Sequence, residues 1–441
     1  MPDNKRLVLS TSPRLRAALL CLLYFCQGFP WGFATIALVA TLSAQGYPKA
    51  ETASIVALSI LPWTFKFFWA PIIDSVRFPS LGNRRPWLIF AQTGIAVMLL
   101  VPVVLGTVSN DSSLMFLAWT FFAVNCFCSM QDVCTDALAV DLLSPTERGR
   151  ILSFMWASQI TGIALGGAGM AIVIDRSGIP TAMLMQAAMV IAVMLLIVAV
   201  YERPGNRRFP WEPHDDHVEV DRPFGFMITI KELIRALSNR TTFTLVFIAF
   251  AYKLVEGIYE PLVAELLIQD FGWTAAEFAT RQGTFGMGGE FIGALVGGFM
   301  ADRFGRRKMV FAGLAGLMSV LCGFALSQGF WSNPDFPVVL LLPVTKFMIA
   351  FTTVSMFTLF VKVSWTTAAA TQFTLYMAMS NLGHAAGAKV NSWFAGYGLT
   401  NADFFMLAGL TQLLPMLMLI VLDPDSVAAR REAEEAVLEA G

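Results

Sequence analysis

Charged residues are scarce in this chain of 441 amino acids, and their scarcity excludes most classes of soluble protein. Asp, Glu, Lys and Arg make up 14% of the residues, whereas hydrophobic side chains make up 56%. Soluble domains contain about 25% charged and about 45–50% apolar residues. A soluble chain of two or three domains is therefore excluded, as are disordered and collagen-like chains. The formal net charge of -1 says nothing about partners, and we expect no nucleic acid among them.

Cysteine and histidine are also few. All six cysteines lie inside apolar runs and none forms a Cys-x-x-Cys pair, which predicts buried thiols and no disulfide scaffold. His214 and His217 stand close together and are a possible metal-ligand pair, but their polar surroundings favour a solvated linker. We expect no metal and no cofactor.

Motifs of enzymes and ATP-driven pumps are absent from the sequence. It contains no Gly-x-x-x-x-Gly-Lys-[Ser/Thr] loop and no His-Glu-x-x-His motif. His384 is the only histidine within a long apolar run, where a hydrogen-bonded core residue is favoured over a proton carrier. The sequence therefore predicts neither an enzyme nor an ATP-driven pump.

Long hydrophobic runs, in contrast, are abundant. A membrane-spanning helix needs about 20 mostly apolar residues, and backbone groups in lipid must bond internally, which favours helices over any other form. The first run is too long for a signal peptide, whose apolar region has about 7–15 residues. The sequence predicts an all-α integral membrane protein with 12 transmembrane helices in two six-helix bundles. The predicted spans are 16–43, 52–73, 87–108, 114–139, 150–174, 180–201, 242–267, 277–301, 309–328, 337–361, 367–395 and 402–422.

The basic residues predict the orientation of the chain in the bilayer. Of the 30 Lys and Arg residues, 23 fall on the side of the N-terminus, and only Lys49 and Arg176 fall on the other. Because basic loops stay in the cytoplasm, both termini are predicted to be cytoplasmic, in a multi-pass protein of the inner cell membrane. The lipid bilayer is then its main partner, and we expect a monomer.

One long polar stretch divides the spans into six and six. Within it, the segment Ile230 to Leu237 has apolar residues at helical spacing and is predicted to lie along the membrane surface. The predicted domains are an N-terminal bundle at 1–201, a cytoplasmic linker at 202–240, a C-terminal bundle at 241–423 and a cytoplasmic tail at 424–441.

A repeated loop follows the second and the eighth span. Its two aspartates, Asp74 and Asp302, are 228 positions apart, which is about half the chain. A carboxylate at a helix end can bind arginines of its own loop and the N-terminus of a neighbouring helix. Such contacts would close one side of the protein and break when that side opens; the alternative is that the arginines only anchor the topology. The candidate gating residues are Asp74, Arg77, Arg84, Arg85, Gly298, Asp302, Arg303, Gly305, Arg306 and Arg307.

This repeat resembles the major facilitator superfamily. The second copy matches that superfamily's Gly-x-x-x-Asp-Arg-x-Gly-Arg-Arg loop in full, and the first is a degenerate copy with an inserted Phe-Pro-Ser-Leu-Gly. Glycines at spacing four in spans 5 and 8 also predict helices that approach closely. These glycines are Gly162, Gly166, Gly289, Gly293 and Gly297.

Ionisable residues inside the spans are the candidates for function, because each costs about 2.5–3.5 kcal/mol at bilayer depth. Asp132 and Asp136 in span 4 lie one turn apart on one helical face, and Lys253, Glu256 and Glu260 line one stripe of span 7. Lys253 can pair with Glu256 in one state and release it in another, and a desolvated carboxylate can take up a proton near neutral pH. The alternative is a set of static ion pairs. The predicted proton-coupling residues are Asp132, Asp136, Glu256, Glu260 and Glu290.

Several segments resemble one branch of the superfamily, which holds the anhydromuropeptide permeases and the acetyl-CoA transporters. Matching residues are Gln27, Gly28 and Pro30 in span 1, Lys66, Trp69, Pro71 and Asp74 in span 2, Gln131, Asp132 and Asp136 in span 4, and Tyr252, Lys253 and Leu254 in span 7. The resemblance implies proton-driven uptake of a large polar solute. Glu256 departs from the branch, which has aspartate there.

The lysines of three different spans favour an anionic solute if they share a cavity. The predicted substrate-binding residues are Gln27, Lys66, Gln131, Lys253, Lys346 and Lys389. The sequence predicts a secondary transporter that works by alternating access and takes up a muropeptide-like solute together with protons. A siderophore, acyl-CoA or drug transporter of the same fold stays open, as does a membrane sensor that does not transport.

Overall fold

The fold is given by a computed structural model. It describes residues 7–38, 41, 58, 61–63, 65–76, 78, 80–108, 114–144, 146–212, 231, 234–235, 237–273, 277–278, 281–331, 335–364, 369–394 and 398–422. Arg77, His214, His217, the first part of the second predicted span and the predicted tail lie outside these residues. Within them the chain is helical, apart from turns and one isolated β-bridge between Val8 and Tyr201.

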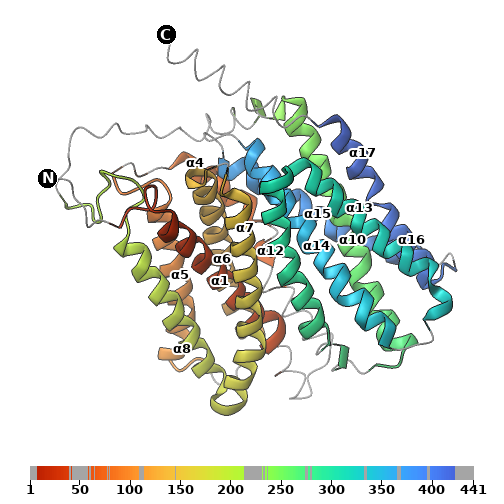
Figure 1. The fold of residues 1–441 in the computed structure, drawn as a ribbon. Coiled ribbons are helices and arrows are strands. Elements are labelled where there is room, and N and C mark those ends of the chain that lie inside the picture. The colour runs from red at the N-terminus through yellow and green to blue at the C-terminus, as the bar shows by residue number, and fades with distance from the viewer. Residues whose placement is uncertain are drawn as a thin grey trace, which may run out of the picture. The chain divides into compact units, whose positions relative to one another are not determined.

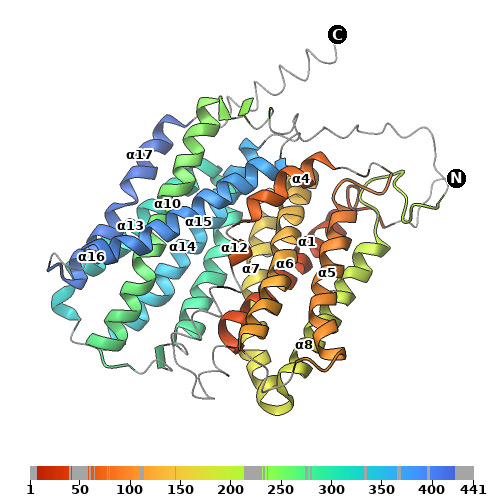
Figure 2. The ribbon, with the colours of Figure 1, turned by 180° about the vertical axis from the view of Figure 1, so that it is seen from behind.

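The chain divides into two compact units, drawn in Figures 1 and 2. Unit 1 comprises Met1–Leu143, Ser158–Glu232 and Thr366–Thr374, and unit 2 comprises Ser144–Ala157, Leu233–Trp365 and Leu375–Gly441. Each unit thus contains one short segment from the opposite half of the sequence.

The helices of unit 1 are α1 (Pro13–Gly32), α4 (Trp69–Ser75), α5 (Arg85–Val104), α6 (Leu114–Leu142) and α8 (Met170–Ala199). Those of unit 2 are α10 (Arg240–Glu265), α12 (Met287–Phe304), α13 (Arg306–Leu326), α14 (Asp335–Val363), α16 (Asn401–Leu410) and α17 (Leu413–Val421). Two helices, α7 (Arg148–Ala164) and α15 (Ala369–Phe394), begin in one unit and continue in the other.

These helices match the predicted spans, except for the second, whose described residues form two 3₁₀ turns, Leu61–Trp63 and Lys66–Phe68, before α4. Eight helical stretches of the described residues are long and apolar enough to cross a membrane. The predicted boundary between spans 5 and 6 is a break inside α8, where Gly178 has φ 82 and Pro180 follows. Glycine has no β-carbon and adopts this conformation without strain. The all-α membrane fold predicted from the sequence is confirmed.

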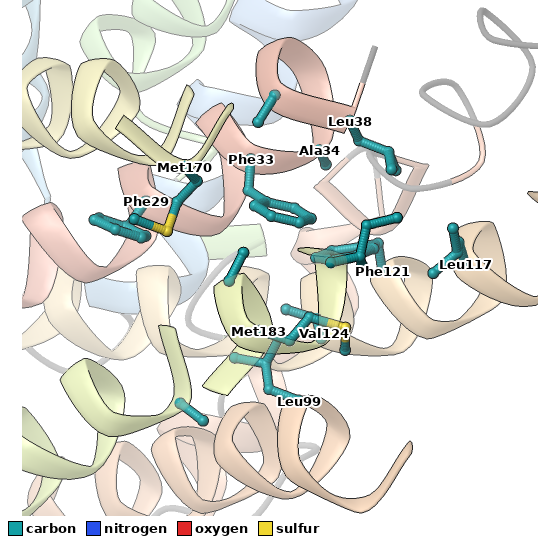
Figure 3. Close-up of a cluster of buried hydrophobic side chains, with 14 of the residues drawn as sticks. Phe29, Phe33, Ala34, Leu38, Leu99, Leu117, Phe121, Val124, Met170 and Met183 are labelled. Atoms are coloured by element: carbon teal, nitrogen blue, oxygen red, sulfur yellow. The ribbon is translucent and has the colours of Figure 1, made fainter. Parts of the chain in front are cut away.

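The apolar core of unit 1 joins α1, α5, α6 and α8, as Figure 3 shows. Phe33, in the π-helical turn Phe33–Ala37 that continues α1, stacks on Phe121 of α6 with ring centroids 4.9 Å apart, and Leu99, Met170 and Met183 contribute to the same cluster. α1 and α6 run in opposite directions. The packing that stacks these two rings therefore also places Tyr24, nearer the start of α1, against Asp136 in the second half of α6.

The core of unit 2 centres on Phe405 of α16. Phe324 of α13 lies edge-on to Phe405 at 4.9 Å, and Tyr259 of α10 packs on Phe405 from another side at 6.5 Å. Aromatic pairs in such tilted arrangements add about 0.5–1.5 kcal/mol beyond the burial of their surface. This packing fixes α10, the helix that carries the charged stripe.

Glycines bring three pairs of helices into backbone contact. In α12 a β-carbon on Gly289 or Gly293 would collide with the carbonyl oxygen of Pro343 or Phe347 in α14, and these two helices lie side by side in Figures 1 and 2. The same arrangement joins α1 to α7 through Gly28, Gly32, Gly162 and Gly166, and α15 to α10 through Gly383 and Gly387. The predicted close approach is therefore confirmed, and it extends to helices for which it was not predicted.

We expect Gly289→Ala to lower the melting temperature of the purified protein by about 4–8 °C, because overpacking costs about 1–3 kcal/mol. Gly288 is the matched control, since it is exposed on the same helix with nothing within 4 Å of its β-carbon position. Gly288→Ala should leave the melting temperature unchanged or raise it slightly, as alanine favours helix. Equal losses in both variants would contradict the packing role.

Candidate functional site

Two aspartates of α6 form the acidic centre of unit 1. Asp132 and Asp136 are 4% and 3% exposed, so neither charge is hydrated. Asp132 binds the Nζ of Lys66 at 2.7 Å, whereas Asp136 accepts a hydrogen bond from the Tyr24 hydroxyl of α1. The Lys66–Asp132 pair is thus compensated, and the second carboxyl group, that of Asp136, has a hydroxyl as its partner.

Aromatic and amide side chains fix the position of Lys66. It lies in a single 3₁₀ turn, Lys66–Phe68, and its Nζ is 5.9 Å from the centroid of the Trp63 ring. The indole Nε1 of Trp63 donates to Oδ1 of Asn125 in α6 at 2.7 Å. The ring therefore faces the lysine in a fixed orientation and adds a cation–π contact.

Two glutamines lie beside the acidic centre. Nε2 of Gln131 donates to the carbonyl of Leu23, and Oε1 of Gln27 accepts from Gln159 of α7 at 3.3 Å. Nε2 of Gln27 and Oε1 of Gln131 have no hydrogen-bond partner among the described residues, although both atoms are buried. One donor and one acceptor are thus left for a water molecule or a solute.

The charged stripe of α10 carries two ion pairs in unit 2. Lys253 binds Glu256 three residues along the same helix. Glu260 binds two partners, the Nζ of Lys346 in α14 at 3.0 Å through Oε1 and the Nε2 of His384 in α15 at 3.3 Å through Oε2. The side chain of Glu260 is 38% exposed and that of His384 is 41% exposed, so water reaches both groups.

The other predicted ligands of unit 2 are placed differently. Glu290 of α12 is half-buried within electrostatic reach of Lys346, Lys253 and Glu256, and it has no ion pair with a described residue. Lys389 lies exposed on α15, beyond His384. The predicted cavity shared by lysines of three spans stays a prediction, because Lys66 belongs to unit 1.

Asp74 at the end of α4 is the centre of a buried network in unit 1. Its Oδ1 binds Arg84 at 2.9 Å, and Arg84 binds Asp141 of α6 with its Nε, also at 2.9 Å. Burial alone would lower the pKa of the Arg84 guanidinium, but the carboxylates of Asp141 and Asp74 raise it above its usual value. Oδ2 of Asp74 accepts from the backbone N–H and the hydroxyl of Thr371, at 2.8 Å each.

Asp302 at the end of α12 makes the corresponding contact in unit 2. Its two carboxylate oxygens accept from the backbone N–H groups of Gly149 and Arg150, at 2.9 and 2.8 Å. Gly298, one turn earlier, lies against the carbonyl of Gly149 and leaves no room for a β-carbon. Both aspartates therefore bind the first turn of a helix, α15 or α7, where the helix dipole favours negative charge.

The arginines after each aspartate hold other groups. Arg85 donates to the carbonyls of Ile197 and Val198 at the end of α8, and Arg307 donates to the carbonyl of Ile420 at the end of α17. These guanidinium groups satisfy the unpaired carbonyls of a helix C-terminus. The repeated loop thus binds the C-terminus of the last helix in each half through an arginine, and it also positions an aspartate.

The remaining loop residues stand at the surface of unit 2. Arg303 is exposed, with its guanidinium 5.5 Å from the Phe304 ring, and Arg306 is half-buried. Gly305 has φ 96, a backbone conformation that requires glycine between α12 and α13.

Tyr24, Asn125, Asp141 and Thr371 belong to these networks but were not expected from the sequence. Asp141 carried a signal, since it follows Asp136 just beyond the end of the same predicted span. The others are uncharged residues that reach their partners from a different helix, which no local pattern reveals.

Two families match the chain, one in each half. Residues 16–170 match Acetyl-coenzyme A transporter 1, and residues 245–440 match the Major Facilitator Superfamily. Among curated relatives, the anhydromuropeptide permease of Escherichia coli (strain K12) is 26% identical over 323 residues, which are 72% of this chain and 60% of the permease. The putative transporter AmpG 4 of Rickettsia felis is 20% identical over 327 residues, 72% of this chain and 75% of that protein.

Solved structures share the fold. The human organic anion transporter MFSD10 gives a TM-score of 0.65 at 16% identity, over 95% of this chain and 100% of that chain. The Escherichia coli fucose:proton symporter FucP gives 0.66 at 15% identity, over 92% and 98%. The chain is a multi-pass membrane protein with the major facilitator fold, and it resembles the anhydromuropeptide permease and acetyl-CoA transporter branch of that superfamily.

We expect Lys66→Met to lower the melting temperature by about 10 °C, because a buried carboxylate without its base costs about 3–5 kcal/mol. Adding Asp132→Asn should recover most of that loss, since no uncompensated charge then remains. Differential scanning fluorimetry in detergent measures both variants. If the double variant melts no higher than the single one, the ion pair does not determine the stability of this region.

Proposed function

We propose that the chain is a proton-coupled secondary transporter that takes up a large polar, anionic solute by alternating access. The observation that carries the proposal is the position of Glu260, which binds Lys346 on one side and His384 on the other. A carboxylate shared by a permanent cation and a titratable imidazole is suited to exchange a proton for a solute.

The coupling follows from the energy of buried charge. When Glu260 takes up a proton, its charge disappears and Lys346 loses its counterion. An unpaired ammonium group inside the membrane is unfavourable, so it favours an anionic group of the solute as its new partner. When the proton leaves, the Glu260 carboxylate competes for Lys346 again and the solute is released. Proton and solute are therefore bound and released together.

His384 gives the proton a route to and from this site. Its Nε2 lies 3.3 Å from Oε2 of Glu260, and both side chains are partly exposed. Histidine changes its charge near neutral pH and transfers protons readily. In this proposal His384 passes the proton between water and the carboxylate.

The excess carboxylates support proton binding in both units. In unit 1 Asp136 adds a second acid beside the Lys66–Asp132 pair, and in unit 2 Glu290 adds a third acid to two lysine–glutamate pairs. An uncompensated carboxylate in an apolar interior is stabilised when it takes up a proton. Lys253 and Glu256 form a second ion pair that can exchange in the same way as the first.

The nature of the solute is inferred from free polar groups and from relatives. Nε2 of Gln27 and Oε1 of Gln131 offer one donor and one acceptor, which match the carbonyl and N–H of an amide. Relatives named anhydromuropeptide permeases support a muropeptide-like solute, with acyl-CoA and siderophores as the alternatives for an uptake assay.

The two aspartate contacts are proposed as the gates. Asp74 on Thr371 and Asp302 on Gly149 hold the first turns of α15 and α7, and their release would free those helices to move. We place these gates at the cytoplasmic side of the inner membrane, with both termini in the cytoplasm, and expect the transporter to act as a monomer.

We expect Glu260→Gln to abolish uptake driven by a pH gradient while exchange of solute across the membrane continues, because glutamine mimics the protonated carboxylate. The measurement is uptake of labelled muropeptide into proteoliposomes, with and without an inward proton gradient, beside a counterflow assay. A loss of about 100-fold in gradient-driven uptake is expected for a proton carrier.

Glu265→Gln is the matched control, because Glu265 is an exposed glutamate at the end of the same helix. It should keep both activities. Uptake by Glu260→Gln that still rises with the pH gradient would show that another group carries the proton.

For the gate, we expect Asp302→Asn to lower the turnover rate about 10-fold and to change the solute affinity less than twofold, because an amide cannot accept both N–H bonds at the start of α7. Initial rates over a range of solute concentrations separate the two effects. Lys308→Gln, which changes an exposed residue of the following helix α13, should behave as the wild type. A change in affinity alone would contradict the gating role.

A further inference from the structure

The chain directly after α8 is folded onto the gate end of unit 1. Glu202 is 1% exposed, although it lies in the segment predicted to begin the linker. Its Oε1 accepts from the backbone N–H of Asn83 at 3.1 Å, and its Oε2 accepts from those of Arg84 and Arg85 at 2.8 and 3.0 Å. One carboxylate thus satisfies three amides at the start of α5 that would otherwise have no acceptor.

The surroundings hold this carboxylate in place. The backbone of Tyr201 and Glu202 pairs with the N-terminal segment, where the N–H groups of Leu9 and Ser10 donate to their carbonyls at 2.8 and 3.2 Å. On the other side Gly82 has φ 104, and a β-carbon there would lie 2.7 Å from Oε2 of Glu202. The loop before α5 therefore closes around Glu202.

Arg84 connects this cap to the gate. Its backbone N–H is held by Glu202, and its guanidinium binds both Asp74 and Asp141. Asp74 in turn binds Thr371. A continuous series of charge-assisted hydrogen bonds therefore leads from Glu202 through Arg84 and Asp74 to the first turn of α15. Such bonds are roughly twice as strong as neutral ones.

We infer that Glu202 is a positioning residue for the gate: it fixes the first turn of α5 so that Arg84 spans Asp74 and Asp141, and thereby holds Asp74 on Thr371. Glu202 touches neither Asp74 nor Thr371 and acts through Arg84. The inference rests on the proposed gating role of Asp74. It also makes the start of the linker part of the gate, so that a displacement of residues 201–202 reaches α15.

A double-mutant cycle between Glu202 and Thr371 tests this inference. The parent protein lacks its native cysteines and carries Thr374→Cys as a reporter, at a position that is 1% exposed. Glu202→Gln and Thr371→Val are introduced into this parent one at a time and then together. Labelling with a maleimide in detergent reports how often the segment opens. Each single variant should label roughly 10-fold faster than its parent, because each removes part of one series of bonds.

If both residues act on the same gate, the double variant should label no faster than the faster single variant. Independent effects would multiply, to roughly 100-fold, as expected for distant residues without shared partners. A multiplied rate, or a Glu202→Gln variant with the parent's rate, would overturn the inference. If Glu202→Gln does not fold, Glu202→Asp takes its place, since it keeps the charge and shortens the side chain.

Glu212→Gln is the matched control. Glu212 lies in the same folded segment and caps the backbone N–H of Arg208 at 2.7 Å, without contact to Arg84. This variant should be labelled at the parent's rate. Faster labelling of Glu202→Gln then reflects opening of the gate and not a general loosening of the segment. Because labelling needs no solute, a chain that transports nothing but shows the expected cycle would refute the proposed transport function and leave the link between Glu202 and the gate intact.

Discussion

The cost of an unpaired charge in an apolar medium determines the arrangement of this protein. Lys66, Lys253 and Lys346 each lie inside a predicted span, and each binds a carboxylate within hydrogen-bond distance. Breaking such a pair without a replacement costs about 3–5 kcal/mol, so a charged partner can leave only when another arrives or when a proton removes the charge. In a static protein this rule only stabilises the helices, whereas in a carrier it links the movement of a solute to that of a proton.

The same rule explains why the proposed gates are built on helix ends. Asp74 and Asp302 each neutralise part of a helix dipole and satisfy backbone N–H groups that have no partner inside the helix. A lysine in place of the helix end would hold the carboxylate more strongly and would open less readily. A contact of moderate strength, repeated in both halves, suits the proposed gates, which close and open in every cycle of a carrier.

The sequence predicted the spans, the repeated loop and the charged residues, because each depends on local composition or spacing. It did not predict the pairing of side chains. Asp136 meets Tyr24, and Glu260 meets His384, only because the packing of helices far apart in the sequence brings them together. His384 was expected to be a core residue, yet its side chain is 41% exposed beside a carboxylate.

Charge alone was also a poor guide to the roles of the arginines. Arg84, Arg85 and Arg307 carry the same group and lie in corresponding loops, but only Arg84 binds the carboxylate of the repeat. The other two satisfy helix carbonyls, whose positions depend on where α8 and α17 end. The carboxylate of Glu202 was overlooked for a similar reason, since its partners are backbone groups that leave no trace in the sequence pattern.

The glycine contacts have a mechanical consequence. Where α12 meets α14, and where α1 meets α7, a backbone carbonyl of one helix packs directly against a glycine of the other. Two helices in such contact can slide along each other by a fraction of a turn without any side chain changing its rotamer. The two helices therefore resist separation but can shift lengthwise past each other. Each unit can then change shape while its helices keep their spacing.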